Sequence, residues 1–348
     1  MAKALNLSPS TVSRGLRNHP LINEATRKKI SRTALELGYQ QNTFASNLRM
    51  KRSNTIGVVV PRLDSYFMSK VISGMEKVAN LHGYNLIINQ SDESSEKESA
   101  CVRTMYNSRV DGMLISLAAE TENLDHLHLI REKEIPLVFF DRTETQCSCS
   151  SVRIDNFKAG YEATKHLTDQ GCRDILHIGG KLQSSVYRER FGGYKKALEE
   201  AGIPFKKEYL HTDNLRNTDT SSIVRLIRSG ILKPDGIFAS RDSCAVDLIL
   251  RLKQQGYSIP GDIAVVGFNN DPVSQVVEPN LTTVEYLGAE IGEAAAGKLF
   301  DLIFGKIDGK DGELILPHHL LIRASSLRSQ LIGEDHAKEL VKTTDNHI

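Results

Sequence analysis

The sequence of 348 residues contains no tryptophan and no long run of hydrophobic residues. A membrane-spanning helix needs about 20 consecutive apolar residues, and no stretch of the chain approaches that length. The hydrophobic segment typical of a signal peptide is also missing after Met1. These absences argue against secretion and membrane insertion, so we expect a cytoplasmic protein. The chain length predicts at least two hydrophobic cores.

Cysteine is scarce, and the five cysteines lack the spacing of zinc ligands. We interpret the one close pair, Cys147 and Cys149, as loop thiols in preference to a metal or redox site. The sequence has neither a dinucleotide-binding fingerprint nor a Walker loop. The adjacent His318 and His319 would point to opposite faces of a strand and could not easily share an ion. We therefore predict a protein without enzyme activity, cofactor or metal site.

Charge is unevenly distributed along the chain. Residues 1–53 carry ten Lys or Arg and two acidic residues, which gives this segment a net charge of +8. The remainder carries 34 basic and 41 acidic residues, a net charge of −7. A strongly basic segment on an acidic body is typical of a module that binds a polyanion. A solvated basic face without a partner would have the same charge, so the charge alone does not identify a binding module.

Residues 8–18 have the signals of a helix with one buried and one exposed side. Ser8 is a favourable N-cap, and Pro9 is a favourable first helical residue. Val12 and Leu16 lie one turn apart and would be buried. The opposite side carries small hydroxyl groups and one guanidinium, which fit phosphates and base edges. These exposed residues are Ser10, Thr11, Ser13 and Arg14.

Two further helices flank this segment. Residues 2–5 would end a first helix, and Asn23 would cap a third helix that stops at Gly38. The buried face of the third helix would comprise Ile30, Ala34 and Leu37. Three short helices that share one small core predict an all-α helix-turn-helix, with residues 8–18 as the recognition helix.

These segments resemble the DNA-binding headpiece of the LacI/GalR family of bacterial transcriptional regulators. The resemblance covers the blocks LSPSTVSRGLRN, INEATRKKI, LGYQQN and ASNLR, whose spacing agrees without gaps. It implies that residues 1–42 form a helix-turn-helix headpiece that binds double-stranded, pseudo-palindromic operator DNA. The residues implied in DNA contact are Ser8, Pro9, Ser10, Thr11, Ser13, Arg14, Arg17, Asn23, Thr26, Ala45 and Leu48.

Residues 43–53 correspond to the hinge helix of that family. The segment is too short to form a stable isolated helix, and in the family it becomes helical when the dimer sits on operator DNA. By the resemblance, Leu48 is wedged between base pairs in the minor groove, and Ala45 packs beside it. A plain linker, with Leu48 resting on the next domain, is the alternative.

The resemblance has one departure, at its start. Family members carry a few more residues before the position of Met1, in a run such as TIKDI that opens helix 1. Either the start codon is assigned too far downstream, or helix 1 is shortened. A shortened helix 1 would weaken DNA binding. A small-molecule (sugar) binding protein of the same fold with impaired DNA binding is therefore the alternative function.

From residue 55 onward, short apolar segments alternate with amphipathic helices. The predicted strands are residues 55–61, 84–90, 111–117, 136–142, 151–155, 174–180, 235–242 and 263–271. Continuous apolar strands separated by helices indicate parallel sheets covered on both faces. So many strands predict two doubly wound lobes with a seam near residue 154. The chain would return to the first lobe at residues 281–286, and residues 314–326 would supply the last strands.

The predicted domain boundaries follow from this pattern. An α/β effector-binding and dimerisation domain spans residues 54–329, and a polar tail spans residues 330–348. Its first lobe comprises residues of about 54–154 and 284–315, and its second lobe those of about 155–283 and 316–329.

Polar residues follow five of the predicted strands. Ligands of open α/β sheets lie beyond the carboxyl ends of the strands, so these residues predict a binding cleft between the lobes. They are Arg62 and Asp64; Asn89, Gln90 and Asp92; Asp141 and Arg142; Arg241 and Asp242; and Asn269, Asn270 and Asp271.

The same region resembles the family's effector domain, which has the two-lobed fold (type I) of periplasmic sugar-binding proteins. The resemblance is carried by PLVFFDR, RFGGYKKAL, DGIFASRD, IPGDIAVVGFNND and PNLTTVE. It implies that Arg190 clamps the effector and that Asp141 lines the cleft. It also implies that Tyr66 and Phe67 flank the ligand from the first lobe. Without tryptophan, a sugar ring would stack on an aromatic side chain among Tyr66, Phe67 and Phe191.

Two positions depart from the family pattern. Asn269 stands where sugar-responsive members often have an aspartate, and Arg241 stands where many have an asparagine. The loss of a carboxylate and the gain of a guanidinium favour an anionic effector, such as a phosphorylated sugar or a sugar acid. Internal pairing of Arg241 with Asp242 or Asp271 is the alternative.

The resemblance implies a repressor that acts as a homodimer, or as a tetramer, at the bacterial nucleoid. Closure of the lobes on the effector would change the spacing of the hinge helices and so the affinity for the operator. A solute-binding protein that feeds a transporter has the same two-lobed fold. The basic headpiece argues against it.

Overall fold

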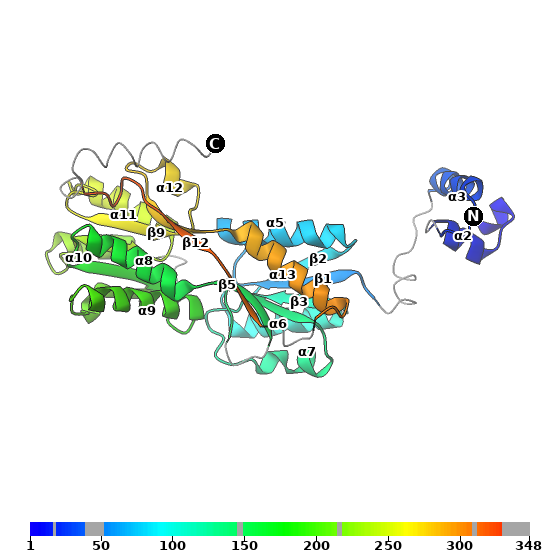
Figure 1. The fold of residues 1–348 in the computed structure, drawn as a ribbon, viewed down its shortest axis with the longest axis horizontal. Helices are drawn as coiled ribbons and strands as arrows, with labels where there is room; N and C mark the ends of the chain where they lie inside the picture. The colour runs from blue at the N-terminus through cyan, green and yellow to red at the C-terminus, as the bar shows by residue number, and fades with distance from the viewer. Residues whose placement is uncertain (17–18, 39–51, 145–148, 214–217, 308–311, 329–348) are drawn as a thin grey trace. The chain divides into compact units, whose positions relative to one another are not determined.

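Two units make up the protein, Met1–Ser53 and Asn54–Ile348, each with its own hydrophobic core. The computed structural model describes residues 1–16, 19–38, 52–144, 149–213, 218–307 and 312–328 (Figure 1). The predicted tail and most of the predicted hinge lie outside the described residues, as do Arg17, Ala45 and Leu48.

The first unit contains three short helices, as the sequence predicted. They are α1 (Ala2–Leu5), α2 (Pro9–Leu16) and α3 (Glu24–Glu36). Leu5 and Val12 pack against Ile30, which is completely buried. The prediction that Leu37 belongs to this core is wrong. Helix α3 ends at Glu36, and Leu37, which follows as the C-cap, is 56% exposed.

The second unit begins with a fully parallel six-stranded sheet. Its spatial order is β11 (Glu313–Leu316), β5 (Ser150–Ile154), β4 (Leu137–Phe140), β3 (Gly112–Ile115), β1 (Thr55–Val60) and β2 (Asn85–Gln90). Helices α5 (Tyr66–Leu81) and α13 (Gly288–Ile303) cover one face. Helices α6 (Ser95–Asn107) and α7 (His128–Glu132), with η1 (Asp125–Leu127), cover the other (Figure 1). This sheet and its helices form the first lobe.

The second lobe is built on another six-stranded sheet. Its order is β12 (His318–Leu321), β10 (Thr282–Tyr286), β9 (Ala264–Phe268), β8 (Gly236–Ala239), β6 (Ile175–Gly180) and β7 (Leu210–Asp213), and only the β10–β12 pair is antiparallel. The helices of this lobe are α8 (Asn156–Asp169), α9 (Ser185–Glu200), α10 (Thr220–Arg228), α11 (Asp242–Gln254) and α12 (Val273–Val276), with η2 (Lys207–Tyr209).

All eight strands predicted from apolar runs are confirmed, but the predicted return point is wrong. Strand β10, which covers residues 282–286, belongs to the second sheet and pairs with β9 and β12. The chain returns to the first lobe only with α13. It therefore crosses between the lobes after β5, after β10 and between β11 and β12. Short crossovers of this kind are typical of proteins whose lobes close on a ligand by hinge motion.

Helices α5 and α13 approach each other at two glycines. A Cβ atom on Gly292 would lie 2.0 Å from the carbonyl oxygen of Val71, and one on Gly74 would lie 2.1 Å from that of Ala289. The contacted atoms belong to the backbone, so they cannot rotate away. The two glycines thus allow the helices to approach more closely than larger side chains would, and α13 packs tightly against α5 of the first lobe.

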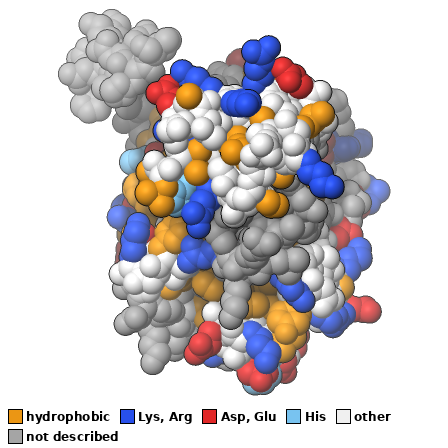
Figure 2. Space-filling model, turned by 90° about the vertical axis from the view of Figure 1, so that its right-hand side faces the viewer, with side chains coloured by type: hydrophobic (Ala, Val, Ile, Leu, Met, Phe, Trp, Pro, Cys, Tyr) orange, Lys and Arg blue, Asp and Glu red, His pale blue; other side chains and the backbone are white. Residues whose placement is uncertain are grey.

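The surface mixes charge types. Figure 2 shows one face of the molecule, on which Lys and Arg side chains are interspersed with acidic and hydrophobic ones. Among the described residues, none of the helices has the length and apolar character needed to cross a bilayer.

Candidate functional site

The N-terminus of α2 carries a compact network of hydroxyl groups. Ser8 Oγ accepts a hydrogen bond of 3.1 Å from the backbone N–H of Thr11, which confirms Ser8 as the N-cap. The same oxygen lies 2.8 Å from the hydroxyl groups of Ser10 and Thr11. With Pro9 as the first helical residue, this network fixes the start of the helix and presents its hydroxyls at one end.

The other predicted DNA-contacting residues that are described also lie on the surface. Asn23 caps α3 by accepting a 2.8 Å hydrogen bond from the backbone N–H of Thr26. Arg14 is exposed, and Ser13 and Thr26 are half-buried. The surface of α2 is therefore accessible to a partner, and contact with DNA stays a prediction.

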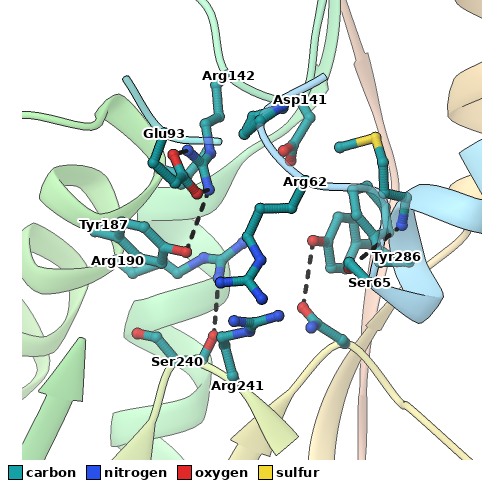
Figure 3. A pocket seen from close by; sticks show the side chains of 15 residues that line it. Arg62, Ser65, Glu93, Asp141, Arg142, Tyr187, Arg190, Ser240, Arg241 and Tyr286 are labelled. Carbon is teal, nitrogen blue, oxygen red and sulfur yellow. Dashed lines mark hydrogen bonds and ion pairs between the residues drawn. The ribbon is translucent and has the colours of Figure 1, made fainter. Parts of the chain in front are cut away.

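A pocket lies between the two lobes of the second unit, at the carboxyl ends of the strands (Figure 3). It encloses about 540 Å³ of empty space, including solvent at its mouth. The charged residues that line it are Arg62, Glu93, Asp141, Arg142, Arg190 and Arg241.

A largely buried ion pair lies in the first-lobe wall, with the side chains of Arg142 and Glu93 10% and 19% exposed. Arg142 donates two hydrogen bonds to Glu93, from Nη1 to Oε2 at 2.5 Å and from Nη2 to Oε1 at 3.0 Å. The backbone N–H of Ala119 donates a third, of 2.9 Å, to the carboxylate. Burial alone would raise the pKa of Glu93, but the charge and hydrogen bonds of Arg142 outweigh it and lower the pKa below its ordinary value. Glu93 is therefore ionised and satisfied.

Asp141 lies beside this pair in a strained backbone conformation. It follows β4 with a φ of 57°, in the left-handed region that side chains other than glycine rarely adopt. Burial raises the pKa of its carboxyl group, against the opposing effect of the nearby charges of Arg142 and Arg190. Strain of this kind is concentrated at binding sites, where the surrounding structure maintains it.

The second lobe supplies Arg190, which is only 3% exposed. Its Nε donates to Asn156 Oδ1 at 2.9 Å, and its Nη1 donates to the carbonyl oxygen of Ser240 at 3.2 Å. The guanidinium lies over the ring of Phe268, 3.5 Å from the ring centre. Arg190 is therefore held on three sides, and its position is fixed before any ligand arrives.

Tyr187 connects the two walls. It lies one turn before Arg190 on α9, with its ring centre 5.7 Å from that guanidinium and 5.5 Å from the guanidinium of Arg142. Its hydroxyl also accepts a 3.5 Å hydrogen bond from Arg142 Nη2 across the lobe boundary. This contact between the lobes thus involves the same guanidinium that pairs with Glu93.

Asn269 sits on a loop that a buried carboxylate holds in place. Its φ is 113°, and its side-chain oxygen accepts a 3.3 Å hydrogen bond from the hydroxyl of Tyr286. In the same loop, the backbone N–H of Asp271 donates to Asp242 at 2.7 Å, and the hydroxyl of Thr283 donates to the other carboxylate oxygen at 2.7 Å. Asp242 therefore positions the loop without reaching the pocket.

The ionisation of Asp242 should make stability depend on pH. Burial raises its pKa to about 7, even though the hydrogen bond from Thr283 opposes the shift. The unfolded chain loses this proton near pH 4, so between pH 4 and 7 the native state binds more protons and stability falls as pH rises. We expect this loss, at most about 4 kcal/mol, to disappear in Asp242→Asn. Urea unfolding at pH 4.5 and 7.5 would measure it.

A matched control is Asp169→Asn, because Asp169 is an exposed acid whose ion pair with Lys165 lies on the surface. This variant should retain the wild-type pH dependence. An Asp242→Asn variant with the same pH dependence as the wild type would show that the buried carboxyl group does not titrate in this range.

The structure brings together five of the seven predicted effector residues. Phe67, Asp141, Arg190, Arg241 and Asn269 line the pocket. Tyr66 and Phe191 are not among its lining residues. Neighbouring residues on a helix point about 100° apart, so each turns away while the adjacent residue faces the pocket. The ring of Tyr66 lies beside Lys70, and that of Phe191 packs near His177 and Tyr194.

Four of the five predicted sets of strand-end residues contribute to this pocket. The fifth contributes to an adjoining pocket between the lobes, which Asp92 lines together with Glu93 and Tyr187. Asn89, Gln90 and Asp92 do not line the inter-lobe pocket just described, because β2 is the edge strand of its sheet. Gln90 instead accepts a 2.8 Å hydrogen bond from the backbone N–H of Leu63. Glu93, a residue further along, lines the pocket in their place.

Sequence reasoning missed several lining residues, among them Tyr187, Glu93 and Tyr286. Tyr187 could have been found, because it lies three residues before Arg190 and so on the same helix face. Glu93 and Tyr286 offered no such signal, since their places in the pocket depend on contacts with distant segments.

The cysteines and metal-ligating residues add no second site. Cys101, Cys172 and Cys244 are free and buried. Cys149 is disulfide-bonded, so its interpretation as a loop thiol is wrong, and Cys147 lies outside the described residues. Within the described ranges, no group of three His, Cys, Asp or Glu residues is arranged to hold a metal ion.

Comparisons with known proteins agree with the two-unit structure. The sequence model of the lacI family of bacterial regulatory proteins matches residues 1–42, and that of a periplasmic binding protein-like domain matches residues 164–326. Catabolite control protein A of Priestia megaterium is 30% identical over 328 residues, which cover 94% of this chain and 98% of that protein. The transcriptional regulator RegA of Clostridium acetobutylicum is 32% identical over 333 residues, 93% of this chain and 97% of that protein.

A solved structure shows the same fold. The lac repressor dimer, bound to operator and the anti-inducer ONPF, superposes with a TM-score of 0.82 and 22% identity, covering 94% of this chain and 98% of that one. The relatives are transcriptional regulators, not enzymes. With its helix-turn-helix, its two-lobed α/β domain and full-length relatives, the chain belongs to the lacI family of bacterial regulatory proteins and is a DNA-binding transcriptional regulator.

Proposed function

We propose that this protein is a homodimeric repressor of the bacterial cytoplasm, whose affinity for operator DNA is set by a small molecule bound between its lobes. The observation that carries the proposal is the pocket, where Asp141, Arg190 and Asn269 converge from two strand ends and one helix. Two of these residues have strained backbones, and the third is fixed in advance by hydrogen bonds. Such a site is built for a ligand.

The proposed operator contact rests on α2. Its exposed side presents small hydroxyls beside Arg14, whose guanidinium can form two hydrogen bonds with guanine in the major groove. The lac repressor of the comparison is a dimer on its operator. A dimer of this chain would place two copies of α2 in successive major grooves of a pseudo-palindromic site, with residues 43–53 meeting at its centre.

The coupling between sites follows from the lobes. Ligand bound at the carboxyl ends of strands from both lobes favours the closed arrangement. The chain crosses between the lobes three times, so closure must rotate one lobe against the other. If the lobes have one relative orientation when the dimer is bound to DNA and another when it is free, effector binding and operator binding are coupled. Each ligand then changes the affinity for the other by the same factor.

Substitution of Arg14 tests the DNA part of this proposal. We expect Arg14→Ala to weaken binding to a sequence selected from a random pool by about 5- to 150-fold, the value of one specific bidentate contact. Gel shifts with the full-length protein at fixed salt would measure it. Lys165→Ala, which removes an exposed basic residue of α8, should leave DNA affinity unchanged. Equal affinities of Arg14→Ala and wild type would show that α2 does not read the operator.

A further inference from the structure

We infer that the effector is an anion, whose carboxylate or phosphate group binds among the guanidinium groups of Arg62, Arg190 and Arg241. The inference rests on the proposed function, since it names the chemical class of the molecule that the pocket accepts. It is argued from the placement, hydrogen bonding and charge of these three arginines.

The three arginines reach the pocket from separate elements. Arg62 follows β1, Arg190 lies on α9, and Arg241 follows β8. In Figure 3 the side chain of Arg62 crosses the middle of the pocket, with Arg190 and Arg241 beside it. Like charges that converge in a partly desolvated space repel one another. An oxyanion bound among the three guanidinium groups would offset this repulsion and accept charge-assisted hydrogen bonds from them.

Arg62 has a hydrogen-bond donor to spare. Its Nε donates to Asp64 Oδ1 at 2.7 Å, and its Nη2 pairs with the other oxygen of the same carboxylate. Its Nη1 is buried and has no hydrogen-bond partner among the described residues. A buried N–H without an acceptor is unfavourable. Because Arg62 lines the pocket and is largely buried, a ligand oxygen is the natural acceptor for Nη1.

The carboxylates of the site leave this end positively charged. Glu93 is occupied by Arg142, with which it forms a bidentate pair. Asp64 pairs with Arg62, but its side chain is 62% exposed and lies outside the pocket lining. Four arginines and two acids line the pocket. The lining can therefore accept one negatively charged group of a ligand without the site becoming negative overall.

Arg241 has interactions of its own, and its charge acts on carboxylates of both lobes. It lowers the pKa of Asp64 together with the larger effect of Arg62. It also acts against the burial that raises the pKa of Asp271. Arg241 thus contributes positive potential at the lobe boundary even where it is paired, and a ligand oxyanion at that boundary would add to these interactions.

The same pocket also carries groups that suit hydroxyls. Asp141 follows β4 of the first sheet and Asn269 follows β9 of the second, and both side chains carry oxygens that can accept hydrogen bonds from hydroxyls. A ligand that carries both hydroxyls and one oxyanion matches these oxygens and the arginines. Sugar acids and sugar phosphates have this composition, and their shared chemistry is a polyol that carries an oxyanion.

A matched ligand series tests the inference. Full-length protein would be titrated calorimetrically with glucose, glucosamine, gluconate, glucose 6-phosphate, 6-phosphogluconate and inorganic phosphate. We expect one or more of the anions to bind at least tenfold more tightly than glucose and glucosamine, with affinity that falls as salt rises. Preference for gluconate or for glucose 6-phosphate separates a carboxylate from a phosphate group. Failure of every anion in the series to bind would overturn the inference.

Variants locate the anion. Arg62→Gln and Arg241→Asn should each weaken the best anion at least tenfold, because each removes one charge and leaves a side chain that can still form hydrogen bonds. Arg225→Gln, which changes an exposed arginine of α10 with 75% side-chain exposure, should have no effect. Thermal unfolding without ligand would establish that all three variants are folded. Unchanged anion affinity in both pocket variants would overturn the inference.

The outcomes also separate this inference from the proposed function. If only neutral sugars bind, and they change operator affinity in gel shifts, the protein is an effector-controlled regulator and the anion assignment is wrong. If anions bind at Arg62 and Arg241 without any change in operator affinity, the anion assignment holds and the proposed coupling is wrong.

Discussion

Replacement of Gly292 by alanine should lower the free energy of unfolding of the two-lobed unit by about 3 kcal/mol. The added Cβ would lie 2.0 Å from the carbonyl oxygen of Val71 and 3.0 Å from the backbone nitrogen of Met75, both on α5. Neither atom can move without its helix, so α13 must shift away from α5 and open the core beneath it. Urea unfolding of the full-length protein, followed by circular dichroism, would measure the loss.

Gly297→Ala is the matched control, because Gly297 lies on the same helix with no atom within 4 Å of its added Cβ. Alanine favours a helix over glycine by about 0.5–1 kcal/mol, so this variant should be as stable as the wild type or more so. Both substitutions add one methyl group to a glycine of α13, but only Gly292→Ala should lower the free energy of unfolding. Equal effects would show that the close approach of α5 and α13 does not limit the packing.

The architecture could be predicted because its strands are buried on both faces. Runs such as residues 55–60 and 264–268 are continuous and largely apolar. Each therefore predicts a central strand even when the strands that pair with it are unknown. Strand β7 was missed because Leu210–Asp213 is a half-exposed edge strand with polar residues. Strand β10 was assigned to the wrong lobe because its sequence would fit either sheet. Only its pairing with β9 and β12 shows that it belongs to the second sheet.

The pocket was predictable to the extent that it depends on strand ends. Asp141 and Asn269 follow a strand directly, and Arg241 lies two residues after one, so the strand-end rule placed them without any contact being known. Arg190 came from the family resemblance. Phe191 was misplaced because sequence proximity to a site residue does not determine the direction of a helical side chain. Glu93 was missed because its role is defined by an ion pair with a residue 49 positions away.

Removal of one partner from that ion pair should have the largest effect in the pocket. We expect Arg142→Leu to lower the free energy of unfolding by about 3–5 kcal/mol, because it leaves the carboxylate of Glu93 buried without its cation. Arg142→Leu combined with Glu93→Gln should be less destabilised than Arg142→Leu alone, since no unpaired charge then remains. Urea unfolding of the single and double variants at pH 7 would measure both.

Acid should reduce this difference. The pKa of Glu93 lies below its ordinary value in the native state, so its pair stabilises the protein above the unfolded pKa and stops doing so as pH falls through the native one. Wild type and Arg142→Leu should therefore converge at low pH. Lys165→Leu, which breaks an exposed pair with side chains 50% and 56% exposed, should cost less than about 1 kcal/mol.

Arg142→Leu should also change ligand binding, because Arg142 contacts Tyr187 across the lobe boundary. Without that contact the closed arrangement loses a hydrogen bond to a charged group, about 1.5–3 kcal/mol, and effector affinity falls by roughly 10- to 150-fold. Tyr187→Phe keeps the ring beside both guanidiniums and removes only the hydroxyl, so it should lower affinity without destabilising the protein. Equal ligand affinity in wild type and both variants would mean that closure of the lobes is independent of this contact.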